Sequence, residues 1–315
     1  MNKKIWFIGI LVVIGIFGFA LIRKKEWTET KFMMDTVCEI KVVARLRPRK
    51  AIDDAFMVMH KIDSLASFEG SGDIARINRG ENISVSPEVV ELIKDGIKVG
   101  DLSQGAFDIT VRPLMELWGD FKTQRVPDEK EINELLPLVD YKRVILNSED
   151  KIEFGKRGMK LDLSGIAKGY AVDLAVEKLK SMEVSAGLVN AGGDMKVFGD
   201  RVWKIGIKNP RGSGIVKVLE LKNQSVATSG DYEKYFILDG VRYHHILDPS
   251  TGLPASHCVS VTVISDSAWF ADALATGIFV LGPGRGIQLL DSLCIPGLII
   301  TPDLQFHESK SMANF

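Results

Sequence analysis

The sequence has little of what marks a disulfide-rich, nucleic-acid-binding or disordered protein. Cysteine occurs 3 times in 315 residues, and no two cysteines have the C-x-x-C spacing of a zinc or redox motif. Cys38, Cys258 and Cys294 each lie in an apolar or β-branched stretch, which predicts small core residues. The net charge is -1 and no long basic run occurs beyond the N-terminus, so we expect no nucleic-acid partner. A hydrophobic content of 46% predicts a globular protein with a sizeable core.

Charged side chains are absent from residues 5–22, which are flanked by basic residues on both sides. At about 1.5 Å per helical residue, this segment comes close to the roughly 30 Å of a bilayer core. It lacks the small-residue pattern of a cleavage site, and no cysteine follows at lipoprotein spacing. We therefore favour an uncleaved single-pass anchor in the cytoplasmic membrane over a removed signal peptide or a buried helix. Residues 1–25 are predicted as the anchor or signal segment, and 26–315 as one continuous folded unit for which a bilobal form stays open.

Hydrophobic periodicity predicts an α+β fold. Alternation over 36–44 predicts a strand, and an apolar stripe over 49–66 predicts a helix. Ser86 and Pro87 predict the start of another helix, which ends near Gly105. Further elements are predicted as helices over 164–181 and 266–281 and as strands over 187–190, 202–207, 215–221, 235–238, 259–264 and 297–300. Because helices and strands do not alternate strictly, we expect mixed or antiparallel sheets packed with helices.

Two polar side chains stand out in the apolar helix predicted over 266–281. Asp266 is its predicted N-cap, and Asp272 and Thr276 lie four residues apart, which places both on one face. A buried carboxylate needs a partner charge or a cation, and carboxylate, hydroxyl and carbonyl oxygens suit magnesium or calcium. From spacing alone, a metal site and an aspartate held by backbone N–H groups are both open.

A second segment, 160–173, is predicted as a short strand that leads into a helix. Ser164 is the predicted cap, and the free N–H groups of the first helical turn form an anion-binding end. Lys168 lies one turn further on, where it could meet a phosphate. An ordinary capped helix with a surface lysine is the alternative.

Glycines provide two weaker signals. Gly192 and Gly193 follow a predicted strand, where they could let the backbone approach a ligand and offer N–H donors, or could form a hairpin turn. The glycine-rich run 282–286 follows a helix rather than a strand, so it does not fit a dinucleotide-binding motif. We interpret it as the end of a helix and a turn.

Two adjacent histidines precede a turn predicted over 248–252. On an extended chain His244 and His245 face opposite ways, so only one of them can enter a given site. A histidine at the edge of a turn could act as a general base near neutral pH. A purely structural histidine is the alternative.

These segments together resemble the FAD:protein FMN transferase family, also called the ApbE family, over nearly all of the chain after residue 25. The motifs that carry the resemblance are Met34-Asp35-Thr36, residues 105–110 with 113–114 and 117–119, residues 162–170, residues 190–194, residues 228–232, residues 245–249 with 251–252, and residues 272–276. Their number and their order make the resemblance specific.

The resemblance implies an enzyme that cleaves FAD, attaches FMN through a phosphoester to a Ser or Thr hydroxyl of a target flavoprotein, and releases AMP. Asp272, Thr276 and the carbonyl of Gly165 would hold Mg²⁺, with Ca²⁺ or Mn²⁺ as alternatives. His245 would be the base that activates the acceptor hydroxyl. The implied FAD site is lined by Met34, Ala106, Phe107, Asp108, Asp162, Lys168, Gly192, Gly193, Ser229 and Ile246. Met34 and Phe107 are the predicted apolar wall for the flavin ring.

The chain departs from the family pattern at two places. Asp35 stands where the family usually has glycine after methionine, and residues 67–72 stand where the family has a Ser-x-Tyr stretch. The resemblance also implies a catalytic domain on the extracytoplasmic side. The implied acceptors are subunits of membrane redox complexes, such as sodium-pumping NADH:quinone oxidoreductase or Rnf-type complexes. A metal-dependent FAD pyrophosphatase and a membrane-tethered FAD-binding protein without catalysis are the rival hypotheses.

Overall fold

An eight-stranded sheet forms the centre of the fold in a computed structural model that describes residues 24–148 and 150–315. The strand order is β1-β2-β5-β6-β9-β12-β13-β14, and every neighbouring pair is antiparallel. The strands are β1 (Lys25–Met33), β2 (Thr36–Ala44), β5 (Ala186–Ala191), β6 (Asp194–Gly199), β9 (Ser225–Gly230), β12 (Ser260–Ser265), β13 (Gly297–Ile300) and β14 (Phe306–Glu308). The predicted α+β class with antiparallel sheets is confirmed. The predicted anchor, 5–22, lies outside the described residues.

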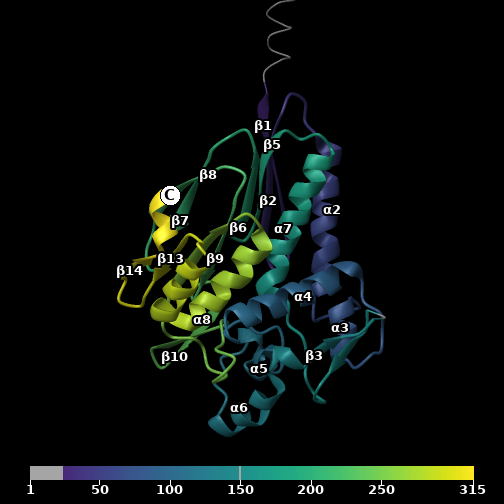
Figure 1. Ribbon diagram of the computed structural model, residues 1–315, viewed down its shortest axis with the longest axis vertical. Coiled ribbons are helices and arrows are strands. Elements are labelled where there is room, and N and C mark those ends of the chain that lie inside the picture. The colour runs from purple at the N-terminus through teal and green to yellow at the C-terminus, as the bar shows by residue number, and fades with distance from the viewer. Residues whose placement is uncertain (1–23, 149) are drawn as a thin grey trace, which may run out of the picture.

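Helices cover one face of the sheet. Helix α7 (Ser164–Ser181) packs between α2 (Arg49–Ala66) and α8 (Ala268–Ser292), and α4 (Pro87–Leu102) contacts α2, α7 and α8 (Figure 1). Apolar side chains of α2, α4 and α7 form one core with β2 and β5, and those of α8 form a second core with β9, β12 and β13. Helix α7 therefore belongs to the first core and borders the second through its contact with α8.

The other face of the sheet is covered by a hairpin of β7 (Trp203–Lys208) and β8 (Ile215–Leu221). Its inward side chains pack against β5, β6, β9 and β12. Both faces of the central strands are thus buried, which explains why β12 carries five buried residues in succession.

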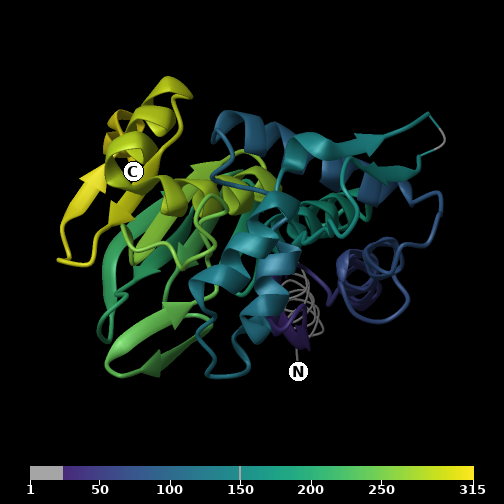
Figure 2. The ribbon, with the colours of Figure 1, turned by 90° about the horizontal axis from the view of Figure 1, so that it is seen from below.

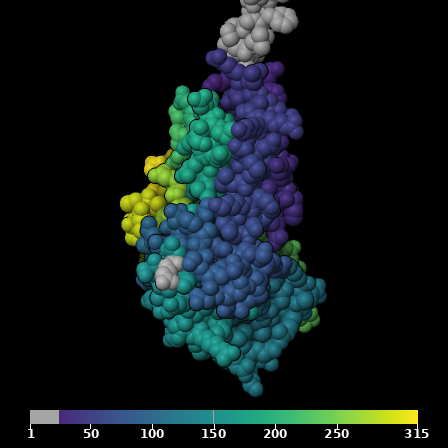
Figure 3. All heavy atoms as spheres, turned by 90° about the vertical axis from the view of Figure 1, so that its right-hand side faces the viewer, coloured from purple at the N-terminus to yellow at the C-terminus, as the bar shows by residue number. Residues whose placement is uncertain are grey.

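Shorter elements fill the end of the molecule near the N-terminus of α7 (Figures 1 and 2). They are α3 (Asp73–Asn78), α5 (Arg112–Leu117), η1 (Gly119–Phe121), α6 (Glu129–Leu135), η2 (Leu136–Leu138), η3 (Tyr141–Arg143), and the hairpins β3 (Val144–Leu146) with β4 (Ile152–Phe154) and β10 (Tyr235–Leu238) with β11 (Val241–His244). The chain closes elsewhere, with η4 (Lys310–Asn314) beside β13. The β10–β11 hairpin packs Phe236 against Trp118 and Phe121 of the α5 region. The side of the molecule formed by α2, α3 and their neighbours is shown in Figure 3.

Local patterns located most elements well. The predicted bounds of β2, α2, β8, β10 and β13 are correct, and β5, β7 and β12 differ by one residue at either end. Residues 160–163 form no strand, so that part of the prediction is wrong. The helix predicted to end near residue 281 is interrupted at Gly282, where φ is 76°, and a second segment begins at Pro283. Cys38 and Cys258 are buried as predicted, whereas Cys294 is exposed.

Helix α8 is the only helix among the described residues that is long and apolar enough to cross a membrane, with a mean hydropathy of 1.3. Of its most apolar stretch of 18 residues, 56% is buried inside the protein. Because its apolar side chains pack against the sheet, we interpret α8 as a core helix.

Close approach of α7 and α8 requires Gly169. A Cβ atom at this position would lie 2.3 Å from the carbonyl oxygen of Ala268. We expect Gly169→Ala to lower the free energy of unfolding by about 1–3 kcal/mol, because backbone cannot move away as a flexible side chain can. Gly284→Ala is the matched control, since no described atom lies within 4 Å of its added Cβ. Denaturant titration checks this, and equal stability of the two variants would contradict it.

Candidate active site

Helices α7 and α8 each place a carboxylate on the backbone of the other. Asp173 of α7 accepts a hydrogen bond of 3.0 Å from the Trp269 N–H, and thereby caps α8. Asp272 of α8 accepts one of 3.0 Å from the Gly169 N–H. The predicted cap, Asp266, is wrong, because Ser267 occupies the N-cap position and Asp173 makes the bond. This exchange fixes Asp272 beside the first turns of α7.

Lys168 links two buried carboxylates. Its Nζ lies 2.7 Å from Asp194 Oδ2 and 3.5 Å from Asp272 Oδ1. Burial alone would lower the pKa of Lys168, but the two carboxylates outweigh it and raise this pKa, so the lysine stays charged. Burial raises the pKa of Asp272 to about 7; Asp194 adds to this shift and Lys168 opposes it. The site therefore holds two acidic groups and one permanent cation.

The oxygens around Asp272 fit a hard divalent cation. One turn along α8, the Thr276 hydroxyl lies 3.0 Å from the Ser229 hydroxyl on β9. A Cβ on Gly165 would lie 3.8 Å from Thr276 Oγ1, so α7 borders this group of oxygens together with α8 and β9. In a regular helix the Gly169 N–H donates only to the Gly165 carbonyl. Here the same N–H also donates to Asp272, so the Gly165 carbonyl oxygen can act as a metal ligand.

The metal would depend on neutral oxygens as well as on charge. Within residues 24–148 and 150–315, no group of three or more His, Cys, Asp or Glu side chains could hold a metal ion. The set of Asp272, Thr276 and the Gly165 carbonyl combines one carboxylate, one hydroxyl and one carbonyl, and this chemistry suits Mg²⁺ or Ca²⁺ better than a transition metal.

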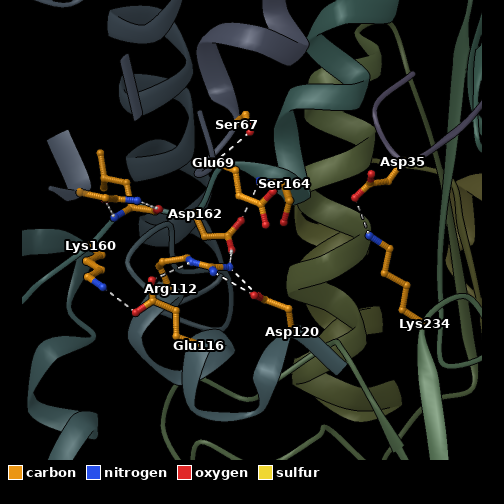
Figure 4. A network of polar contacts seen from close by, with 12 residues as sticks. Asp35, Ser67, Glu69, Arg112, Glu116, Asp120, Lys160, Asp162, Ser164 and Lys234 are labelled. Carbon is orange, nitrogen blue, oxygen red and sulfur yellow. Dashed lines mark hydrogen bonds and ion pairs between the residues drawn. The ribbon is translucent and has the colours of Figure 1, made fainter. Parts of the chain in front are cut away.

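Asp162 holds the start of α7. Its Oδ1 accepts the Ser164 N–H at 2.9 Å. The predicted cap, Ser164, is wrong, because Leu163 occupies the N-cap position and Ser164 is the first helical residue. Arg112, which the sequence analysis missed, lies beneath Asp162, with Nη1 3.7 Å from Asp162 Oδ2 (Figure 4). The same guanidinium pairs with Asp120 and stacks on Phe68. The Arg–Pro pair at the start of α5 carried no signal by itself, because the contact depends on the fold.

Met34 lies in the tight turn between β1 and β2. Met34 and Asp35 both have a φ of 55°, and the Met34 N–H donates to Asp63 Oδ2 at 3.1 Å. A left-handed residue favours glycine but tolerates aspartate, which explains how Asp35 stands where the family has glycine. The Asp35 carboxylate lies 3.3 Å from Lys234 Nζ, on the segment that precedes β10 (Figure 4).

The predicted residues 106–108 lie next to α7 and α8. Phe107 is buried, and its ring lies 3.1 Å from a Cβ built on Gly165. Ala106 is buried and belongs to the α8 core, as does Ile246. The Asp108 carboxylate accepts hydrogen bonds from Thr110 and from the Tyr141 N–H, so it serves the protein's own loops.

Gly192 and Gly193 form the turn of the β5–β6 hairpin, each with a positive φ. The Gly192 N–H donates to the Val37 carbonyl and the Gly193 N–H to Asn190 Oδ1. Both N–H groups are used within the protein, so any part that these glycines take in ligand binding would come from close approach of the backbone. No described atom lies within 4 Å of a Cβ on Gly193.

The two histidines have different surroundings. His244 is buried; its Nε2 donates to the Ala255 carbonyl at 2.8 Å and its Nδ1 accepts the Ile246 N–H at 3.2 Å. Both nitrogens of His244 are therefore used in the fold. His245 makes one ring contact, of 3.2 Å, between Nδ1 and the Lys234 carbonyl. Since a carbonyl can only accept, Nδ1 carries the proton and Nε2 has its lone pair available.

Burial lowers the pKa of His245 to about 3, and the nearby His244, Lys234 and Lys168 act in the same direction, while the bond to the Lys234 carbonyl opposes them. The unfolded chain binds a proton between pH 6.5 and 3 where the folded chain does not. This histidine therefore costs stability as the pH falls below about 6.5. Near pH 5, we expect His245→Gln to reduce the slope of unfolding free energy against pH by up to about 1.4 kcal/mol per pH unit. Denaturant titrations at several pH values check this, and equal slopes would contradict it.

A neutral histidine near an acidic site of hard oxygen ligands and the N-terminus of a helix defines a class of enzyme that acts on a phosphate ester or anhydride. The sequence model of the ApbE family matches residues 34–298, and the chain belongs to that family. It is 34% identical over 267 residues to the FAD:protein FMN transferase of Vibrio cholerae, covering 79% of this chain and 78% of that protein.

Two further comparisons agree with this. The chain is 30% identical to the FAD:protein FMN transferase of Treponema pallidum, covering 98% of this chain and 94% of that protein. The crystal structure of the ApbE protein from Thermotoga maritima superposes with a TM-score of 0.88 at 37% identity, covering 92% of this chain and 99% of that chain. The resemblance inferred from the motifs is confirmed.

Proposed function

We propose that this chain is a FAD:protein FMN transferase, in which a Ser or Thr hydroxyl of an acceptor protein attacks the FMN phosphorus of FAD. A P–O bond forms to the acceptor oxygen, the P–O bond to the AMP phosphate breaks, and AMP leaves with its phosphate. The observation that carries this function is the free Nε2 of a neutral His245 in an acidic site of hard oxygen ligands. Membership of the ApbE family supports the same reaction.

His245 takes the proton of the acceptor hydroxyl in this proposal. A hydroxyl is a poor nucleophile until a positioned base removes its proton. The Lys234 carbonyl holds the ring in the tautomer that leaves Nε2 unprotonated. The low pKa of His245 keeps the ring neutral throughout the physiological range.

Asp272, Thr276 and the Gly165 carbonyl would hold the divalent cation, for which we propose Mg²⁺. When bound, the ion supplies positive charge that offsets the charge of the pyrophosphate oxygens. Lys168 adds a cation that stays protonated, and the first turn of α7 offers N–H groups to the phosphates. Met34 and Phe107, which belong to one apolar cluster, would form the apolar wall for the flavin ring.

We propose acceptors among the subunits of membrane redox complexes, such as sodium-pumping NADH:quinone oxidoreductase or Rnf-type complexes. A membrane anchor over residues 5–22 would keep the catalytic domain close to such acceptors, on the extracytoplasmic side. Protease added outside intact cells should then cleave the catalytic domain. A catalytic domain that stays uncleaved would contradict this orientation.

Incubation with FAD, Mg²⁺ and the purified acceptor subunit of a sodium-pumping NADH:quinone oxidoreductase tests the function. Mass spectrometry of the acceptor should show the gain of one FMN, with AMP released in equal amount. Free FMN with an unmodified acceptor would indicate a pyrophosphatase instead, and FAD that stays intact would indicate a binding protein. A crystal soaked with FAD and Mg²⁺ that shows no ion beside Asp272 and Thr276 would overturn the proposed metal site.

A further inference from the structure

The turn end of the β1–β2 hairpin exposes an apolar pair. Phe32 and Val37 are cross-strand partners and are 77% and 57% exposed. They point away from the core face of β2, which carries Cys38, Ile40 and Val42. Val43 lies at the other end of the same outer face and packs against the cluster beneath β7–β8, whereas Phe32 and Val37 remain uncovered in the described structure.

A second exposed apolar pair lies on the β10–β11 hairpin. Tyr235 and Ile237 are 41% and 54% exposed and share one face of β10, where Arg242 stacks on the Tyr235 ring at 3.8 Å. The opposite face of this hairpin is buried through Phe236. Ile237 therefore projects on the side that has no partner within the described residues.

The two hairpins meet at the candidate active site. The Asp35–Lys234 ion pair joins the β1–β2 turn to the residue before β10 (Figure 4). Met34, a proposed flavin contact, is two residues from Phe32, and His245, the proposed base, follows β11 directly. The two apolar pairs thus belong to the two hairpins that carry residues of the reaction site.

We infer that Phe32, Val37, Tyr235 and Ile237 form the docking surface for the acceptor protein. This rests on the proposed transferase function, in which a protein hydroxyl must reach His245 Nε2 and the body of the acceptor must cover the surrounding rim. Exposed aromatic and branched side chains grouped at such a rim are typical of protein interfaces. A lipid surface fits less well, because β1 runs for roughly 26 Å, at about 3.3 Å per residue, between the end that follows the predicted anchor and the Phe32 end.

Steady-state transfer by the full-length chain in detergent tests this surface, with the soluble domain of the acceptor subunit of a sodium-pumping NADH:quinone oxidoreductase as the probe. We expect Phe32→Ser combined with Val37→Ser, and separately Ile237→Ser, to raise KM for the acceptor about tenfold, with kcat and FAD affinity close to wild type. Leu46→Ser is the matched control, because Leu46 is 74% exposed and lies just beyond the opposite end of β2. Its KM should equal that of the wild type.

Wild-type transfer to the probe tests the proposed function by itself, and the ratio of variant to wild-type KM tests the docking surface. An unchanged KM in both apolar variants overturns the inference, and so does an equal rise in Leu46→Ser. Loss of binding to anionic lipid vesicles, or of self-association in sedimentation, with KM unchanged, would assign the surface to a membrane or to a second copy of the chain. An unfolding temperature equal to that of the wild type would show that each variant folds normally.

Discussion

Replacing His245 with Ala is expected to lower FMN transfer by about 10²–10⁴-fold, the usual contribution of a positioned base, while FAD still binds. The reason is the availability of Nε2: the Lys234 carbonyl occupies Nδ1, and burial keeps the ring neutral. The mass of the acceptor protein measures transfer, and quenching of flavin fluorescence measures binding.

His60→Ala is the matched control for this prediction, because His60 is an exposed histidine on α2. It should keep wild-type transfer. His244 cannot serve as a control, since both of its ring nitrogens are bonded in the fold and its loss would reduce stability. Transfer by His245→Ala within twofold of wild type would rule out this histidine as the base.

Asp272→Asn is expected to remove tight Mg²⁺ binding and to lower transfer by about 10³-fold or more, since a bound ion supplies several kcal/mol of charge stabilisation. Asparagine keeps the shape of the side chain but loses the charge that a cation requires. Lys168 retains its partner Asp194 at 2.7 Å, so the variant should still fold. Calorimetric titration with Mg²⁺, Ca²⁺ and Mn²⁺ measures affinity and identifies the preferred ion.

Thr276 provides the controls for the metal site. Thr276→Ser keeps the hydroxyl and should keep metal affinity close to wild type, whereas Thr276→Val removes the oxygen and should weaken it. Mg²⁺ affinity that is unchanged in both Asp272→Asn and Thr276→Val would show that the ion binds elsewhere.

Local sequence patterns were sufficient to predict the helices and strands that bury one apolar face. The stripe over 49–66 and the alternation over 36–44 predicted α2 and β2 to the residue. β9 was missed because its sequence, SVATSG, is short and polar, and only pairing with β6 and β12 makes it a buried strand. β1 was missed because its residues are mostly exposed, so its pattern reflects an edge strand with little apolar signal.

The motifs predict roles for Asp272, Thr276, Lys168 and His245, but not how these residues interact. The cap that Asp173 provides for α8 joins residues almost a hundred positions apart, and no local signal could indicate it. For the same reason, the sequence leaves a phosphate contact and a surface position both open for Lys168, and it does not indicate the ion pairs with Asp194 and Asp272. Arg112 was missed because its partners Asp120 and Asp162 are brought together by tertiary structure.

The hydrogen bonds that Asp173 and Asp272 form between α7 and α8 connect the proposed reaction site with the packing of the two helices. Gly169 serves both functions, because its N–H donates to Asp272 and its missing side chain allows the close approach of α7 to Ala268 of α8. The fold itself thus positions Asp272, the proposed metal ligand. A variant that altered the spacing of this helix pair would therefore lower the stability of the fold and displace Asp272 at the same time.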